Sequence, residues 1–151
     1  MSPWKVIFLL ACGFIAGMGW APARCQTVID GDTIRMNGST IRLHGIDAPE
    51  LSQTCGDFMA GAYAAAFLRQ ILEGRAVTCE PRTTDRYGRT VALCRADGFD
   101  ISAWMVRQGQ AWAFTRYSAD YADQESIARE QRLGVHAQPC QPAWEYRSEK
   151  R

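Results

Sequence analysis

The feature that most constrains the fold is a tight-turn signal at Asn37-Gly38. Asn-Gly favours a two-residue hairpin turn, because both residues accept a positive φ. Alternating apolar and polar residues flank it, in TVIDGDTIRM before the turn and STIRLHGI after it. Ile41 and Leu43 would share one face of the returning strand, and Arg42 would lie on the other. The sequence therefore predicts an antiparallel β-hairpin.

The rest of the chain alternates between helix and strand patterns. The expected elements are helices over residues 58–74, 101–109 and 118–134, and strands over 76–81, 90–96 and 111–114. Asp100 can cap the second helix, and Ser118 opens the third. Short strands with helices in their connections suit a small closed barrel. We therefore expect an α+β fold, a five-stranded OB-fold-type β-barrel with three α-helices.

The N-terminal segment predicts a signal peptide over residues 1–23. Lys5 gives a positive start, an apolar run follows, and Ala21-Pro22-Ala23 has the small residues of a cleavage site. Lipoprotein processing at Cys12 is the alternative, and it leaves a shorter apolar run than usual. We expect an exported protein, periplasmic or extracellular, with no stable membrane association after cleavage. Its barrel domain would cover 24–136, with a polar tail over 137–151.

Composition and charge indicate a globular domain and exclude a polybasic one. The 151 residues are 47% hydrophobic and 22% charged, which is typical of one globular domain, here expected to be a monomer. The formal net charge is +1 and falls to 0 once the segment with Lys5 is removed. A polybasic nucleic-acid coat is therefore excluded. Any contact with nucleic acid must come from local arginines.

The cysteines predict at least one disulfide. Five of the six lie after the signal segment, and export would place them in an oxidising compartment. Cys79 and Cys94 lie symmetrically about the second hairpin turn, so they would face each other across an antiparallel pair. Two free cysteines packed as small hydrophobes are the alternative. At most two of Cys25, Cys55 and Cys140 can then pair, and the sequence leaves that choice open.

A cluster of acids surrounds the first hairpin. Asp30 and Asp32 are two residues apart, so on an extended strand both carboxylates would point to one face. The hairpin returns the turn 47–50 toward them, where Asp47 and the carbonyl of Ala48 are further oxygen donors. Such oxygen ligands suit a hard cation such as Ca²⁺ or Mg²⁺. The competing interpretation is a polar bulge followed by a solvated proline turn.

Two arginines and one acid complete a candidate phosphodiesterase site. Arg42 and Arg89 could bind phosphate oxygens as negative charge develops. Glu50, which is not expected to bind the metal, could orient or deprotonate a water molecule for attack. A surface salt bridge for Arg42 and an ordinary hairpin turn around Arg89 are the competing interpretations. With a metal, the three side chains predict hydrolysis of phosphodiesters.

The motifs VIDGDT, IRLHGIDAPE, DRYGR and VRQG, in this order, resemble those of the staphylococcal nuclease (thermonuclease) family over about residues 25–136. The resemblance implies that Asp32, Asp47 and the Ala48 carbonyl bind calcium, and that Asp30 is a nearby acid that supports these ligands without binding the ion itself. Alanine at position 48 replaces the threonine of the family's archetype, a change that a backbone ligand should tolerate. The archetype is strongly basic, whereas this chain is close to neutral.

The resemblance also implies a catalytic trio of Arg42, Glu50 and Arg89. The implied activity is Ca²⁺-dependent endonucleolytic cleavage of DNA and RNA that leaves 3′-phosphates. Tyr87 and Tyr117 match tyrosines near the nucleotide pocket, with packing on the barrel as the competing interpretation. The alternative function is a non-catalytic OB-fold module that binds nucleic acid or another partner. Because every acid and arginine of the motif is present, the sequence favours the nuclease.

Overall fold

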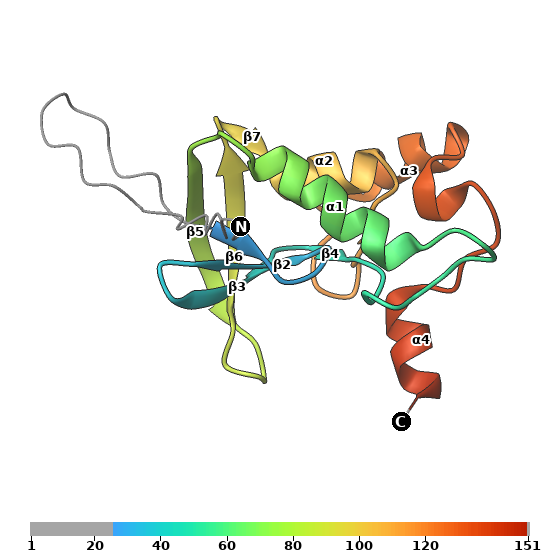
Figure 1. Cartoon of the computed structure of the whole chain (residues 1–151), viewed down its shortest axis with the longest axis horizontal. Helices are drawn as coiled ribbons and strands as arrows, with labels where there is room; N and C mark the ends of the chain where they lie inside the picture. Colours follow the sequence, from blue (N-terminus) through green and yellow to red (C-terminus); the bar gives the residue numbers. More distant parts are fainter. Residues whose placement is uncertain (1–25, 151) are drawn as a thin grey trace, which may run out of the picture.

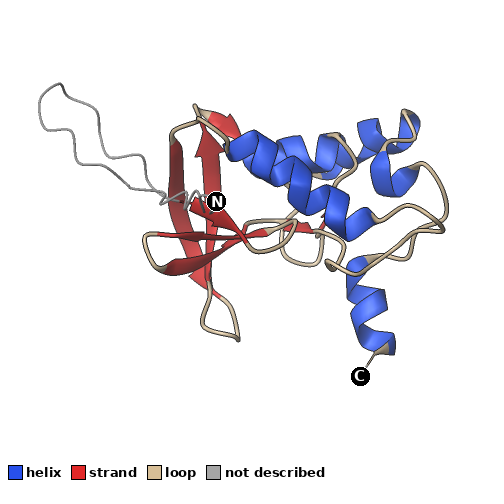
Figure 2. Cartoon of the chain, viewed as in Figure 1, coloured by secondary structure: helices blue, strands red, loops and turns tan. Residues whose placement is uncertain are grey.

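The computed structural model describes residues 26–150, so the expected signal peptide and Cys25 lie outside the described part. Helices α1, α2 and α3 gather on one side of the sheet, while α4 lies apart from them with the C-terminus (Figure 1). The strands are β1 (Gln26–Val28), β2 (Thr33–Met36), β3 (Ser39–Leu43), β4 (Ile46–Asp47), β5 (Val77–Thr84), β6 (Thr90–Ala96), β7 (Phe99–Asp100) and β8 (Trp112–Ala113). This separation of helices from strands makes the fold α+β, as expected (Figure 2).

The main sheet is mixed and open rather than a closed barrel. Its order is β1-β2-β3-β6-β5, with β7 added to β6, and only the β3–β6 pair is parallel. Strand β4 leaves this sheet and pairs with β8, where Ile46 faces Ala113. Among the described residues no ladder joins β1 to β5. The expected five-stranded closed barrel is therefore wrong in strand number and in closure, because short strands divide between two sheets.

The first hairpin forms as the sequence predicts. Asn37 and Gly38 have φ values of 52° and 79°, the positive values that this turn requires. Strands β2 and β3 pair in the register Ile34↔Ile41 and Met36↔Ser39. The alternation of buried and partly exposed residues along β3 fixes which face carries the polar side chains.

The second hairpin is also confirmed. Strands β5 and β6 are antiparallel, with a register shift between Pro81 and Thr83. Cys79 and Cys94 face each other in this register and form the expected disulfide. Because the bridge lies across the two arms, it restrains the strands that carry the turn 85–89.

The chain contains four α-helices among residues 26–150, one more than expected. They are α1 (Ala60–Leu72), α2 (Ile101–Arg107), α3 (Ala122–Glu130) and α4 (Ala143–Glu149), with a 3-10 turn at Gly134–His136. Asp100 caps α2 through the Ala103 N–H, as expected. Helix α3 starts later than predicted, because Ser118 Oγ accepts a turn bond from the Asp120 N–H instead of capping a helix. No helix in this described range is long and apolar enough to cross a membrane.

Helix α1 packs closely against the segment that carries the acids. A Cβ at Gly31 would lie 2.7 Å from the Ala48 Cβ and 2.8 Å from the Ala64 Cβ. Such a contact is too close for any side chain, so only glycine lets the Asp-Gly-Asp segment approach both the 47–50 turn and α1. Buried Leu68 lies one turn further along the same helix. The glycine between the two acids therefore serves close packing.

Candidate active site

Three short elements bring Asp32, Arg42 and Asp47 together. Asp32 immediately precedes β2, Arg42 lies on β3, and Asp47 ends β4. Thr33 pairs with Arg42 across the hairpin, and the Leu43 N–H donates to the Asp32 carbonyl at 2.8 Å. The hairpin register therefore places the Asp-Gly-Asp segment beside the arginine.

The guanidinium of Arg42 bridges the two buried carboxylates. Its Nη1 group donates to Asp32 Oδ1, and its Nη2 group donates to Asp47 Oδ1 at 2.7 Å and to the Ile46 carbonyl at 3.1 Å. The side chains of Asp32 and Asp47 are only 3% and 0% exposed. A buried carboxylate is costly unless it is paired. Arg42 therefore belongs to a buried charge centre and not to a surface salt bridge.

Further hydrogen bonds fix the orientation of Asp32. Its Oδ2 atom accepts the Ala48 N–H at 2.7 Å, and its Oδ1 atom accepts the Thr33 hydroxyl at 3.0 Å. The Asp32 N–H donates to Asp30 Oδ1 at 3.1 Å. Asp30 thus supports the Asp32 backbone.

Burial and charge act in opposite directions at this centre. Burial raises the pKa of Asp47 above its usual range, and the neighbouring Asp32 raises it further, while arginine contacts oppose the shift. Burial and the charge of Asp32 raise the pKa of Asp30 to about 6. Burial opposes the charge on Arg42, but Asp32 and Asp47 outweigh it and raise the pKa of Arg42. The centre therefore requires compensating positive charge to remain ionised.

The donor atoms suit a hard cation, although the acids are few. Among residues 26–150 no three His, Cys, Asp or Glu side chains cluster closely enough to hold a metal. Asp32 and Asp47 are instead two carboxylates that converge on one cationic group, and Ala48 follows Asp47 directly. Two carboxylates completed by a carbonyl and water form an all-oxygen set of the kind that Ca²⁺ accepts. These residues thus fit a cation by the chemistry of their oxygens.

Glu50 lies at the rim of the centre, on a loop held against α1. Its side chain is 41% exposed, so water can reach the carboxylate. The Glu50 N–H donates to Gln53 Oε1 at 3.1 Å, and the Gln53 N–H donates to the Glu50 carbonyl at 2.7 Å. A Cβ at Gly61 would lie 1.8 Å from the Glu50 carbonyl oxygen. The close approach at Gly61 therefore sets the position of this loop.

Arg147 is part of the site, although the sequence reasoning missed it. From α4 its Nη1 group donates to Glu50 Oε1 at 2.8 Å and to Asp47 Oδ1 at 3.1 Å, and its Nη2 group donates to Asp47 Oδ2 at 2.8 Å. The sequence predicts a polar tail over residues 137–151, whereas the structure forms helix α4 there. The available signal was Trp144, a large apolar residue in that tail, since such a residue commonly marks a packed element.

Arg89 sits at the tip of the second hairpin, in a more open setting. Its Nε group donates to Asp85 Oδ2 at 2.7 Å, and its backbone N–H donates to Asp85 Oδ1 at 3.0 Å. The next residue, Thr90, pairs with Ile41 in the parallel β3–β6 ladder. Arg89 therefore immediately precedes β6, the strand that pairs with β3, on which Arg42 lies. Among the described residues, no contact joins the Arg42 and Arg89 side chains.

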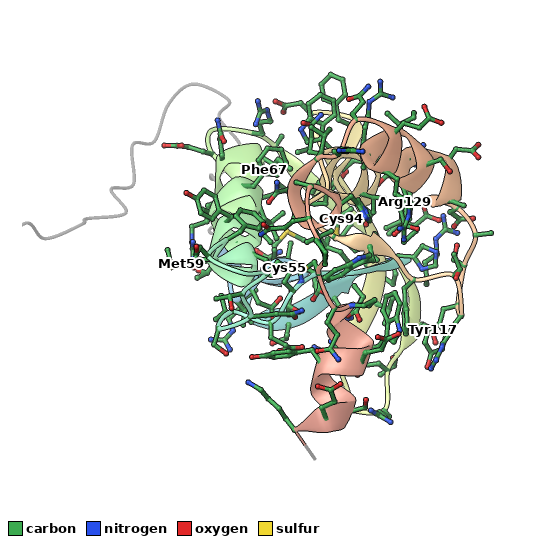
Figure 3. The ribbon with its side chains drawn as sticks, turned by 90° about the vertical axis from the view of Figure 1, so that its right-hand side faces the viewer. Cys55, Met59, Phe67, Cys94, Tyr117 and Arg129 are labelled. Atoms are coloured by element: carbon green, nitrogen blue, oxygen red, sulfur yellow. A yellow bond between two sulfur atoms is a disulfide. The ribbon has the colours of Figure 1, made fainter. Side chains whose placement is uncertain are left out.

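The two candidate nucleotide-binding tyrosines are exposed. Tyr87 is 65% exposed, and the guanidinium carbons of Arg86 and Arg89 lie 4.8 Å and 5.4 Å from its ring centroid. Tyr117, labelled in Figure 3, is 81% exposed and lies 5.0 Å from the Phe114 ring. Neither ring is buried in the core. Both therefore have free surface on which a base could stack.

Residues 40–138 match the family model described as staphylococcal nuclease homologue. The chain is 38% identical to the succinoglycan biosynthesis protein ExoI of Rhizobium meliloti over 75% of this chain and 64% of that protein, so it spans slightly less than two thirds of that relative. It is 35% identical to an uncharacterized endonuclease of Escherichia coli O157:H7, over 84% of this chain and 85% of that protein. It is 36% identical to a micrococcal nuclease of Shigella flexneri, over 85% and 82%.

Proposed function

This chain belongs to the staphylococcal nuclease family, and on that premise we propose that it is an exported, calcium-dependent nuclease that cleaves within DNA or RNA and leaves 3′-phosphates. At the coarser level, its relatives support a hydrolase that acts on nucleic acid. The observation that best supports the finer proposal is the buried pair Asp32 and Asp47 converging on Arg42. Two buried acids with a shared cationic partner suit charge stabilisation more than packing.

Asp32, Asp47 and the Ala48 carbonyl would hold the calcium ion, with Asp30 supporting Asp32. When bound, Ca²⁺ would supply positive charge that neutralises the phosphate and polarises its oxygens. The convergence of the two carboxylates supports this assignment, as does the all-oxygen donor set. The ion would also relieve the cost of burying two negative groups.

Arg42 and Arg89 would bind the non-bridging phosphate oxygens. A guanidinium has five N–H donors, and Arg42 uses three of them on Asp32, Asp47 and the Ile46 carbonyl. Its Nε–H and one Nη1–H therefore stay available. Arg89 uses only Nε in its contact with Asp85, which leaves its terminal amino groups for an anion. Donors held in place by protein contacts stabilise developing charge without reorganisation.

Glu50 would orient or deprotonate the attacking water. Its half-exposed carboxylate is reachable from solvent, and its backbone is fixed by Gln53 and by the approach of α1 at Gly61. A general base must be held within hydrogen-bond reach of its proton donor, and a fixed loop serves that need. The exposed rings of Tyr87 and Tyr117 would offer stacking surfaces to the bases.

Export of the protein is part of the proposal. The predicted signal peptide over residues 1–23 supports it, and so do the disulfides Cys55–Cys140 and Cys79–Cys94, since such bonds persist in oxidising compartments. N-terminal sequencing of the exported protein should give a start close to Arg24. Recovery of an N-terminal peptide that still contains Lys5 would contradict cleavage.

The experiment that tests the function is a cleavage assay on labelled single- and double-stranded DNA and RNA. We expect internal cuts and 3′-phosphate ends with millimolar-range Ca²⁺, and no cleavage with excess chelator until Ca²⁺ is restored. Glu50→Gln should lower turnover by roughly 10²–10⁴-fold, whereas the exposed control Glu80→Gln should not. Full activity in chelator would refute the calcium proposal. Tight binding without cleavage under every condition would instead favour a non-catalytic module.

A further inference from the structure

Helix α4 lies beyond the residues matched by the family model, which end at residue 138. It is nevertheless fixed to the domain. The Cys55–Cys140 disulfide precedes it, and Gln53 Nε2 donates to the Gln141 carbonyl at 2.7 Å. The Gln53 backbone also bonds to the Glu50 carbonyl, so one residue links α4 to the Glu50 loop.

Aromatic packing adds a second attachment for α4. The Trp144 ring stacks on Phe114 with centroids 5.5 Å apart and meets the edge of buried Trp112 at 6.1 Å. Aromatic pairs at such distances stabilise a contact beyond the burial of their area. Figure 3 looks onto the side of the molecule that carries α4. The helix is therefore held in a defined place over the site, and its side chains have a fixed reach.

Helix α4 places the Arg147 guanidinium against the carboxylates of Asp47 and Glu50. The contact with Asp47 is bidentate, since each terminal amino group bonds a different carboxylate oxygen, at 3.1 Å and 2.8 Å. Bidentate pairs are among the stronger charged hydrogen bonds. A typical surface salt bridge is worth little, but here the Asp47 side chain is fully buried. Arg147 therefore occupies both oxygens of a carboxylate that the proposed function assigns to calcium.

The contacts of Asp47 argue that Arg147 and a divalent cation compete. Both Asp47 oxygens already accept guanidinium N–H groups, Oδ1 from Arg42 and Arg147 and Oδ2 from Arg147. A divalent cation would be the third cationic group at this one buried carboxylate, so it and Arg147 would repel each other and contend for the same oxygens. Withdrawal of Arg147 frees Oδ2, which has no other hydrogen-bond partner among the described residues. The Arg147 side chain is 35% exposed, so it can move into solvent.

We propose that Arg147 is a built-in competitor for the cation, which covers Asp47 and Glu50 until the cation displaces it. The inference rests on the proposed function, because it requires a cation at Asp47. Helix α4 supplies the competitor, and the Cys55–Cys140 bond keeps it near the site. Cation binding and release of Arg147 are then two sides of one equilibrium, and each disfavours the other to the same extent.

The test is calorimetric titration of Ca²⁺ into metal-free wild-type protein, Arg147→Gln and the control Lys150→Gln. Lys150 is the exposed residue that follows α4, so this control removes the same charge without touching Asp47. We expect Arg147→Gln to lower the Kd for Ca²⁺ by about tenfold, within the roughly 5–150-fold span of typical couplings. Lys150→Gln should stay within about twofold of wild type, because a distant exposed charge is screened.

Each result has a definite meaning. An unchanged or raised Kd in Arg147→Gln would overturn the inference, while Ca²⁺ binding and cleavage by the wild type would leave the proposed function intact. A lower turnover with an unchanged Kd would also overturn it, because Arg147 would then be a substrate-binding donor. If neither protein binds Ca²⁺ and neither cleaves, both proposals fail. Arg147→Lys should give an intermediate Kd, since it keeps the charge but loses the bidentate contact.

Discussion

The two hairpins each present an arginine beside an aspartate, but in different settings. At the first hairpin Arg42 is 16% exposed and joins two buried acids. At the tip of the second hairpin Arg89 is 28% exposed and is held by the single acid Asp85. Arg42 is therefore a structural part of the centre, in addition to the phosphate-binding role proposed for it. Arg89 is held by one local turn.

This difference implies that Arg42 and Arg89 can share a proposed part in catalysis and still contribute unequally to the stability of the fold. Removing one partner of a buried ion pair leaves an uncompensated charge, whereas an exposed pair contributes little. If both arginines bind the same phosphate, their loss should affect turnover alike and stability unequally. The substitutions below test this contrast, starting with the largest expected effect.

Arg42→Ala should have the largest effect. We expect turnover to fall by about 10²–10³-fold through lost charge stabilisation. The free energy of unfolding should fall by about 3–5 kcal/mol, because Asp32 loses its guanidinium partner in a buried site. Cleavage kinetics and chemical denaturation measure the two quantities. Arg82→Ala is the control, since Arg82 is half exposed and its ion pair is with the exposed Glu80. Equal stabilities for the two variants would contradict the buried-centre account.

Arg89→Ala should lower turnover by a comparable factor of about 10²–10³, with little loss of stability. Its salt bridge to Asp85 is local, so the free energy of unfolding should change by about 1 kcal/mol or less. The same two measurements apply. A near-normal cleavage rate would show that the second hairpin takes no part in the reaction.

Asp85→Asn should have a smaller effect on turnover, about tenfold. The Asp85 carboxylate holds the Arg89 side chain and also accepts the Tyr87 and Arg89 backbone N–H groups. The amide keeps one oxygen acceptor but loses the charge, so Arg89 becomes less well oriented, and misplacement of a reacting group costs up to about 10²-fold. Steady-state kinetics on the variant measure the loss. A loss larger than that of Arg89→Ala would mean that Asp85 acts through something other than Arg89.

Replacing Cys79 and Cys94 together by alanine should have the smallest effect on turnover and a clear effect on stability. The bond closes a sequence separation of 15 residues, for which loop-closure entropy predicts about 3 kcal/mol. Thermal unfolding of the variant measures this loss. Turnover measured well below the unfolding temperature should stay within about threefold of wild type, since the turn 85–89 keeps its own hydrogen bonds. A variant that lost turnover but kept its free energy of unfolding would contradict this expectation.

Short-range features of the fold could be predicted from the sequence. The Asn37-Gly38 turn, the facing pair Cys79 and Cys94, and the Asp100 cap follow from local geometry, and all three are present. Barrel closure could not be predicted in this way, because it depends on which distant edges pair. The structure leaves β1 and β5 apart and sends β4 to β8.

For the candidate site too, the short-range contacts could be predicted from the sequence and the long-range contacts could not. The motif residues Asp32, Arg42 and Asp47 meet because the first hairpin brings them together over short sequence distances. Arg147 was missed because it reaches Asp47 across a separation of 100 residues, and no local pattern specifies that contact. The same holds for the Cys55–Cys140 bond, which spans 85 residues. Long-range contacts of this kind require the fold itself.

The most direct test of a single phosphate shared by the two hairpins is a double-mutant cycle of Arg42→Ala and Arg89→Ala on kcat/KM. Residues that act on one reacting group are strongly non-additive. The double variant should therefore lose little more activity than the less active of the two single variants, so the interaction free energy should approach the smaller single-variant loss, about 3–4 kcal/mol for a 10²–10³-fold effect. Pairing Arg42→Ala with Arg82→Ala should show no such coupling. If the losses from Arg42→Ala and Arg89→Ala simply multiply, the two arginines act independently and the shared-phosphate account is wrong.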